Sequence, residues 1–205
     1  MSLREFTPRI CYRSNAGNVV DDFYVPCMQR STLYRRAVGY FTSASLSLAA
    51  RGAAQLIKCG GRIQLVTSPR LVEDDIEAIE RGYETRGQRI RQLAEVELHQ
   101  LANEIEQERL AALAWLISIG SLEIKLALRV DPSTRRLVRG IYHEKIGVFA
   151  DAGGNLVSFT GSQNETEGGF INNFESIDVY WSWEDPHGRA RSKAADFDDL
   201  CVDAH

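Results

Sequence analysis

The chain has 205 residues, of which 44% are hydrophobic and 25% are charged, a composition typical of a globular protein. It excludes a wholly disordered chain, a collagen-like chain and a coiled-coil rod, and no apolar run approaches the roughly 20 residues that cross a bilayer. The formal net charge of −4 does not favour nucleic-acid binding, although it leaves room for a local basic surface. The four scattered cysteines lack a Cys-x-x-Cys spacing, which speaks against a zinc ribbon or disulfide framework and favours a cytoplasmic location.

The first half of the chain predicts a strand–helix–strand unit. Residues 38–41 form a short apolar strand, and Thr42 or Ser43 can cap a helix that runs to about Leu56. A Cys-Gly-Gly turn ends this helix, because glycine tolerates the left-handed conformation of a helix C-terminus. Arg62 to Thr67 is the next strand. This order implies a parallel strand pair.

Residues 71–118 predict a helical insertion, because apolar side chains recur there at helical spacing while the opposite side carries Glu, Arg and Gln. Two interpretations remain open. The segment either forms a helical hairpin packed on the sheet or protrudes as an arm that contacts a second subunit.

After Gly120 the apolar residues alternate, which predicts a half-buried strand from Leu122 to Leu128. Further strands are expected over 143–150, 155–160 and 177–183, and Phe197 and Leu200 can begin a docked helix. The fold class is therefore α/β, with one mixed β-sheet flanked by helices. We expect a single domain over residues 1–205, as the N-terminal part of a longer protein, because the chain stops without a clear closing element.

His143 and Lys145 stand two positions apart in a strand-like segment, so their side chains share one face of the strand. Ile146 faces the core, and Gly147 is expected to leave the His143 and Lys145 face open. An imidazole can attack phosphorus or move a proton, and an ammonium can neutralise phosphoryl oxygens. The pair therefore suits a phosphate ester, although it also fits a surface pair without chemistry.

Neutral donors and a carboxylate follow in the same region. Ser162 and Asn164 lie in a Gly-Ser-Gln-Asn turn after a predicted strand, and their hydroxyl and amide groups can hold an anion. Glu175 comes just before the next strand, where its carboxylate can accept a hydrogen bond from Nδ1 of His143 and leave Nε2 free to attack. The same residues also suit an ordinary polar turn and a salt bridge to a nearby arginine.

The His143–Lys145 motif, the Gly161–Asn164 turn and Glu175 together resemble the signature of the phospholipase D superfamily, also called the HKD group. The chain is most similar to the single-motif nuclease branch. Its upstream segments DDFYVPCMQRS, RRAVGYFTS and GGRIQLV also resemble the nuclease-like domain at the N-terminus of some bacterial helicase-related and restriction or phage-defence proteins. The resemblance implies a phospholipase D-like mixed sheet.

It also implies hydrolysis of phosphodiesters without a metal or other cofactor. One histidine attacks phosphorus to give a phosphohistidine, a second protonates the leaving oxygen, and lysine and asparagine side chains hold the phosphate. On this basis His143, Lys145, Asn164 and Glu175 are catalytic, and Lys145, Ser162 and Asn164 bind phosphate. The chain has one His-x-Lys motif, so the resemblance implies a homodimer in which His143 of each subunit enters one cleft.

One position departs from the family pattern, which has an aspartate five positions after the lysine. Ala150 stands there, and Asp151 comes one residue later. Strand alternation would place Asp151 on the same face as His143, at the end of the strand. Its role is left open.

Several acidic and histidine residues of this half have side chains that can ligate metals. None of them fits a His-Glu-x-x-His or a Cys/His zinc spacing, and Glu144 is expected to point away from His143. The candidates are His143, Glu144, Asp151, Asp185 and His187.

A basic loop leads into the His143 strand, and two interpretations of it stand side by side. It is either a solvated hairpin loop or a rim that follows nucleic-acid phosphates, for which the planar guanidinium is well suited. Arg35 and Arg36 are secondary candidates for the same role. The loop and the strand before it contain Arg129, Arg135, Arg136 and Arg139.

Three functions are compatible with these features. The first is a nuclease of genome defence or restriction that acts on DNA rather than RNA, with a helicase domain as a possible partner. The second is a catalytically weak nucleic-acid-binding or regulatory module of such a helicase-linked protein. The third is a phospholipase, but no amphipathic helix with a basic face indicates an interfacial enzyme.

Overall fold

The computed structural model describes residues 1–39, 50–68, 116–131, 133, 134, 136, 138, 142–162 and 175–202. Seven strands in these ranges form one sheet in the order β1-β7-β6-β5-β2-β3-β4. Strands β2, β3 and β4 are parallel to one another, with β4 at one edge of the sheet, whereas β5, β6, β7 and β1 are each antiparallel to their neighbours. The strands are β1 (Cys11–Arg13), β2 (Leu33–Val38), β3 (Arg62–Thr67), β4 (Leu122–Leu126), β5 (Ile146–Ala150), β6 (Leu156–Gly161) and β7 (Ser176–Trp181).

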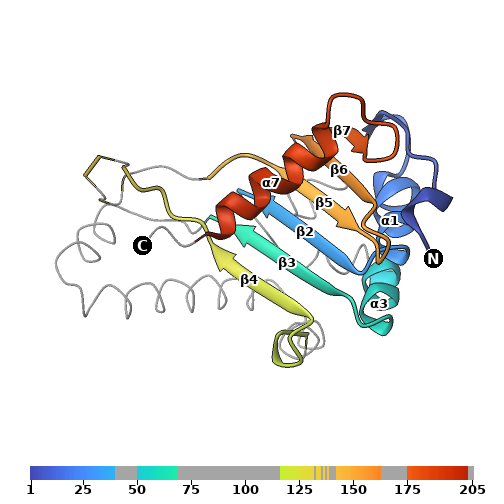
Figure 1. Cartoon of the computed structure of the whole chain (residues 1–205), viewed down its shortest axis with the longest axis horizontal. Helices are drawn as coiled ribbons and strands as arrows, with labels where there is room; N and C mark the ends of the chain where they lie inside the picture. The colour runs from blue at the N-terminus through green and yellow to red at the C-terminus, as the bar shows by residue number, and fades with distance from the viewer. Residues whose placement is uncertain are drawn as a thin grey trace.

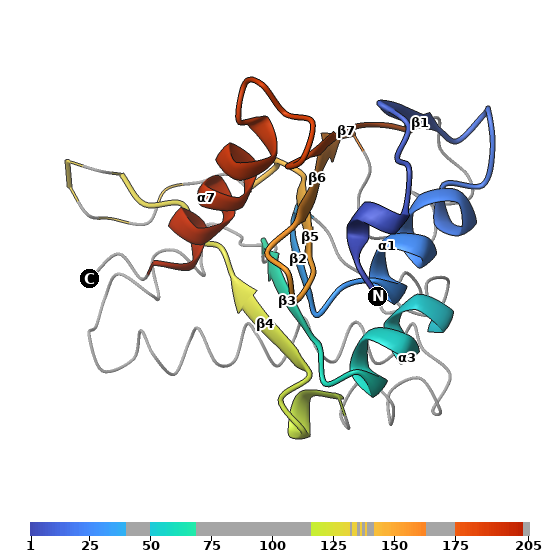
Figure 2. The ribbon, with the colours of Figure 1, turned by 45° about the vertical axis from the view of Figure 1, so that its right-hand side comes forward.

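Helices cover both faces of this sheet (Figure 1). Helix α7 (Arg189–Cys201) lies across one face, and α1 (Val25–Gln29) and α3 (Ala50–Lys58) lie on the other, as Figure 2 shows with the sheet seen nearly edge-on. A short π-helix, η2 (Val20–Tyr24), runs directly into α1, and a 3-10 turn, η1 (Leu3–Glu5), begins the chain. The predicted mixed sheet flanked by helices is confirmed.

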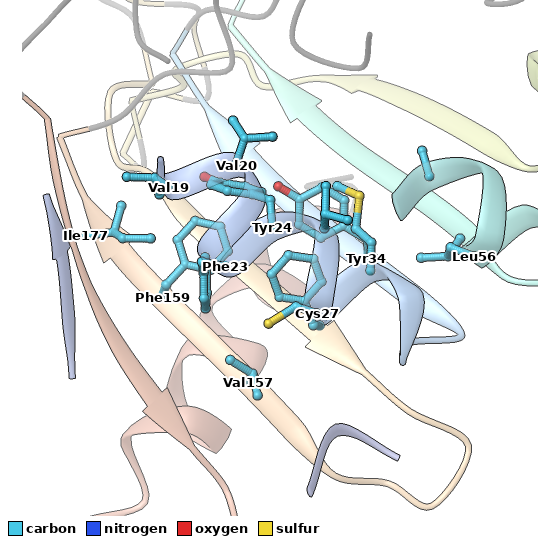
Figure 3. Packing of buried hydrophobic residues seen from close by; sticks show 14 of the residues in the cluster. Val19, Val20, Phe23, Tyr24, Cys27, Tyr34, Leu56, Val157, Phe159 and Ile177 are labelled. Atoms are coloured by element: carbon cyan, nitrogen blue, oxygen red, sulfur yellow. The ribbon is translucent and has the colours of Figure 1, made fainter. Parts of the chain in front are cut away.

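The larger core lies between the sheet and the helices α1 and α3, and aromatic rings dominate it (Figure 3). Tyr34 stacks on Phe149 with ring centroids 4.5 Å apart, and Phe23 meets Phe159 edge-on at 5.2 Å. Burying one such side chain contributes roughly 2–3 kcal/mol. A smaller core under α7 includes Phe197 and Ala194. Because both faces are buried, a polar side chain on these strands needs a partner.

Several predicted elements are confirmed. Strand β3 has the predicted bounds and lies parallel to β2, and the strand after Gly120 is β4. The turn after α3 places Gly60 at φ 75°, with its N–H donating to the Ile57 carbonyl at 2.9 Å. This left-handed residue ends the helix as the Cys-Gly-Gly sequence predicted.

Three predicted boundaries are wrong by three residues or more, and the predicted ends of β4 and β7 are each two residues too late. The strand expected at 38–41 is β2, which begins at Leu33 and ends at Val38, because Arg35 and Arg36 are buried strand residues and not exposed charges. Strand β5 begins at Ile146, three residues after His143. Helix α7 begins at Arg189 instead of near Phe197, because its first buried positions are alanines, which give a weak apolar pattern.

Two predictions fall mainly outside the described residues. The helical insertion at 71–118 is described only from residue 116 onward, and the helix expected from Thr42 or Ser43 is described from Ala50. No helix in the described ranges is both long and apolar enough to span a membrane.

Candidate active site

Four of the predicted site residues lie at one end of the sheet, beyond the end at which β2, β3 and β4 finish and β5 begins; the course of these strands is shown in Figure 1. Ile146 pairs with Ala37 of β2 and with Thr160 of β6, and Gly161 pairs with Ile177 of β7. The residues just before β5 and β7 and the residue just after β6 therefore lie together at this end of the sheet. This register brings His143 and Lys145 to the same end of the sheet as Ser162 and Glu175.

Lys145 and His143 are in direct contact. The Lys145 Nζ atom lies 2.9 Å from His143 Nε2 and donates to the His143 carbonyl oxygen at 2.8 Å. An ammonium has no acceptor, so a protonated Lys145 donates to Nε2 and the imidazole proton lies on Nδ1. The lone pair is then on Nε2, the nitrogen that a nucleophilic histidine uses.

The two side chains differ in burial. Lys145 is 5% exposed, whereas His143 is exposed. Burial lowers the pKa of Lys145 below its usual 10.5, the Arg36 charge lowers that pKa further, and the Glu175 carboxylate partly offsets both effects. The site therefore combines the exposed imidazole of His143 with the buried ammonium of Lys145, an arrangement that favours an anionic ligand.

Ser162 and Glu175 form the second half of the site. The Ser162 hydroxyl donates to Oε2 of Glu175, and its oxygen accepts from the Ser176 N–H at 3.3 Å. Ser14 holds the Glu175 backbone, because its hydroxyl oxygen accepts from the Glu175 N–H at 3.0 Å. Within the described part of this single chain, Glu175 thus contacts Ser162, and the hydrogen bond expected with Nδ1 of His143 is not formed.

Glu144 lies on the other side of the segment, as predicted. Its carboxylate is 3.3 Å from Nζ of Lys193 on α7, while the neighbouring His143 and Lys145 face each other. The alternation of side chains therefore extends through residues 143–145, although regular strand pairing begins at Ile146.

The expectation that Gly147 leaves the face of His143 and Lys145 open is wrong. A Cβ atom at Gly147 would lie 2.0 Å from a ring atom of Phe159, so that ring occupies the space. The Arg36 guanidinium in turn lies over the Phe159 ring, with Cζ 4.8 Å from the ring centroid. Gly147 is required for close packing beneath the site and not for access to it.

Asp151 lies at the opposite end of β5 from His143, so its position after the strand gives it no direct part in the site. One carboxylate oxygen accepts from Ser2 Oγ at 2.8 Å and from the Leu3 N–H at 2.9 Å, and the other accepts from the backbone of Gly153 and Asn155 at 2.9 Å. Burial raises its pKa, but these hydrogen bonds outweigh burial and lower the pKa to about 2. Asp151 ties the N-terminus to the β5–β6 turn.

The basic loop is described in part. The Val138 N–H donates to the Arg129 carbonyl and the Asp131 N–H to the Arg136 carbonyl, so the loop is a hairpin with Arg129 and Arg136 exposed. This hairpin is compatible with both interpretations of the loop. Arg135, Arg139 and Asn164 lie outside the described residues.

The candidates considered for metal binding do not converge. Asp151 is at the far end of β5, and Asp185 accepts from the Ala190 N–H at 2.6 Å at the start of α7. His187 lies in the same connection after β7. Among the described residues, no group of three or more His, Cys, Asp or Glu side chains could hold a metal ion.

The comparisons with known proteins give a match at the level of structure. No protein-family model matches the chain, and no curated protein sequence matches it. The phospholipase D family member Nuc from Salmonella typhimurium is 16% identical with a TM-score of 0.52, over 93% of this chain and 91% of that one. The chain has a phospholipase D-like fold.

Two further solved structures agree. NucT from Helicobacter pylori is 13% identical with a TM-score of 0.52, over 93% of both chains. Phosphatidylserine synthase from Haemophilus influenzae Rd KW20 is 14% identical with a TM-score of 0.54, over 94% of this chain and 37% of that one. At these identities the match confirms the predicted phospholipase D-like fold and leaves the chemistry to be argued from the site.

The sequence analysis missed two residues of this site. No local pattern indicates Ser14, because its contact with Glu175 spans 161 positions of the sequence. Arg36 was placed with the surface arginines, although it is 1% exposed. Its place in an alternating strand from Leu33 to Val38 could have indicated that it and Arg35 face opposite sides of the sheet.

Proposed function

We propose that this phospholipase D-like protein is a metal-independent phosphodiesterase. More specifically, it is a nuclease that hydrolyses DNA through a phosphohistidine intermediate in a site shared by two subunits. The contact between Lys145 Nζ and His143 Nε2, at 2.9 Å, is the observation that carries the proposal. It supports the proposal because a histidine nitrogen and a buried lysine ammonium lie in contact at the end of the sheet that also holds Ser162 and Glu175.

The chemistry follows from these groups. The phosphate group replaces Nε2 of His143 as the partner of Lys145, and the freed Nε2 lone pair forms a bond to phosphorus while the bond to the leaving oxygen breaks. A second imidazolium, from His143 of the partner subunit, gives its proton to the leaving oxygen. Water then attacks phosphorus, its proton returns to that second imidazole, and the electron pair of the P–N bond returns to Nε2.

The surrounding residues have supporting roles in this proposal. Lys145, Ser162 and Asn164 hold the non-bridging phosphate oxygens, and the Glu175 carboxylate stabilises the imidazolium that forms. The arginines at 129, 135, 136 and 139 extend the positive rim along the nucleic acid. The shared site is proposed because one chain contributes one His-x-Lys motif, whereas the reaction uses two imidazoles.

The test is DNA cleavage in excess EDTA. We expect cleavage to persist with the chelator and to be lost in His143→Ala. His187→Ala is the matched control, because His187 is also exposed but lies after the opposite end of β7. Cleavage that disappears with EDTA and returns with Mg²⁺ would contradict the mechanism.

The alternative is a catalytically weak nucleic-acid-binding or regulatory module of a helicase-linked defence or restriction protein. The single His-x-Lys motif favours it, because one chain by itself lacks the second imidazole that the reaction uses. DNA binding that His143→Ala leaves unchanged, without turnover on any DNA strand type, would support this function over the first. A parallel panel of phospholipid substrates tests the lipid-directed possibility.

A further inference from the structure

The consecutive residues Arg35 and Arg36 of β2 point to opposite faces of the sheet. Arg35 faces α7, where its Nη1 lies 2.6 Å from the Asp198 carboxylate. Arg36 faces the side of α1 and α3 and is 1% exposed, so it is the largest fully buried side chain among the described residues. A buried guanidinium is costly unless neighbouring groups compensate for its lost hydration. The residues around Arg36 therefore indicate what it does.

The packing that fixes Arg36 is specific to this position. Arg36 pairs with Gly147, and Gly147 pairs with Phe159, so the three residues form one row across β2, β5 and β6. Because Gly147 has no side chain, the Phe159 ring lies over β5 and provides a flat surface for the guanidinium at 4.8 Å. A cation over a desolvated aromatic face is held firmly in place.

The same row brings Arg36 close to Lys145. In an antiparallel pair, the residue two positions from the direct partner is a diagonal neighbour on the same face, within reach of long side chains. Lys145 stands in that relation to Arg36, since Arg36 pairs with Gly147. The Arg36 charge accordingly lowers the pKa of Lys145, after the larger effect of burial.

In the part of the chain that the structure describes, the charged and titratable groups around Lys145 come from three elements. Arg36 of β2 is positive, Glu175 before β7 is negative, and His143 lies in the segment of Lys145 itself. Repulsion from the fixed guanidinium favours positions of the ammonium away from the interior, and the ammonium indeed lies against Nε2 and the carbonyl oxygen of His143.

We propose that Arg36 is a positioning residue for the phosphate site. Its guanidinium, seated on Phe159 above Gly147, directs the Lys145 ammonium toward His143, where that ammonium serves as the receptor for one phosphoryl group. The inference rests on the proposed function, because it assigns the ligand of the same site. It adds a cation, contributed by β2, that acts through Lys145 and not by contact with the reacting atoms.

The experiment measures binding of inorganic phosphate as a function of pH, without any turnover. Arg36→Met keeps the apolar stem and removes the charge. We expect phosphate binding near pH 7 to weaken by roughly tenfold, the usual scale for losing one partly screened charge interaction. Removing Arg36 also raises the pKa of Lys145, so the loss of binding at alkaline pH should move to higher pH than in the unmodified protein.

Two variants complete the test. Arg36→Lys keeps the charge and should restore both the affinity and the pH dependence to near the original values. Arg35→Met is the matched control from the same strand, and it should change phosphate affinity by less than about twofold, because Arg35 faces α7. If Arg36→Met does not fold, as judged by circular dichroism, Arg36→Gln is measured in its place with the same expectations.

The results separate this inference from the proposed function. The positioning role would be overturned if Arg36→Met, or Arg36→Gln in its place, bound phosphate with unchanged affinity and lost that binding at the same alkaline pH as the unmodified protein. This holds whether or not the protein cleaves DNA. Conversely, weakened and pH-shifted phosphate binding in a protein that never cleaves DNA would support the receptor and reject the nuclease.

Discussion

Asp151 offers a quantitative test of how the fold is held together. Its carboxylate is 6% exposed and accepts hydrogen bonds from Ser2, Leu3, Gly153 and Asn155. The pKa falls from 3.8 to about 2, and at about 1.36 kcal/mol for each pH unit this corresponds to roughly 2 kcal/mol of stability at neutral pH. Asp151→Asn should therefore lower the free energy of unfolding by roughly 2 to 3 kcal/mol at pH 7, because the amide also brings donors toward backbone N–H groups.

The pH dependence gives the sign of this effect. A carboxyl group whose pKa is lower in the folded state stabilises the protein fully above its unfolded pKa and loses that contribution as it is protonated. For Asp151 the loss spans the range from about pH 4 down to about pH 2. The difference in unfolding free energy between the two proteins should therefore shrink over this range.

Urea unfolding at pH 7 and at steps down to pH 2.5 measures both quantities. Asp199→Asn is the control, since Asp199 is an exposed residue of α7 and its replacement should change stability by less than about half a kcal/mol. An Asp151→Asn protein as stable as the original at pH 7, or a difference independent of pH, would refute the account of this anchor.

Three other predictions concern the site. Gly147→Ala should destabilise the protein by roughly 1 to 3 kcal/mol in urea unfolding, because the new methyl group overlaps the Phe159 ring; unchanged stability would mean that the ring is free to move. Hydrolysis of a chromogenic phosphodiester should fall at a pH below 10.5, because the pKa of Lys145 is lowered, and a rate that is constant up to that pH would contradict a role for its ammonium. Light scattering should show a dimer, and mixing His143→Ala with Lys145→Ala chains should not restore activity, since each mixed site still lacks one imidazole and one ammonium; a monomer at every concentration would exclude the shared site.

Local pattern predicted the parts of the fold in which sequence neighbours determine the structure. Strand β3 has its predicted bounds because alternating apolar residues follow a glycine turn, and Gly60 adopts the left-handed conformation that the turn requires. The relative placement of His143, Glu144 and Lys145 also followed from alternation alone.

The errors arose where distant residues decide the outcome. The start of β2 was missed because Arg35 and Arg36 resemble surface charges until Asp198 of α7 and Phe159 of β6 are known to meet them. The role of Gly147 was misjudged for the same reason, since the ring that fills its space comes from another strand.

The bond between His143 and phosphorus is the central claim, and trapping it is the most direct test. The protein would be mixed with DNA in EDTA, quenched in alkali, in which a phosphohistidine survives, and digested for mass spectrometry. We predict an acid-labile adduct in which a DNA end is joined through its phosphate to the peptide that contains His143, and we expect this adduct to be absent from Lys145→Met. Turnover under the same conditions with no adduct, or with the adduct on another residue, would contradict the mechanism.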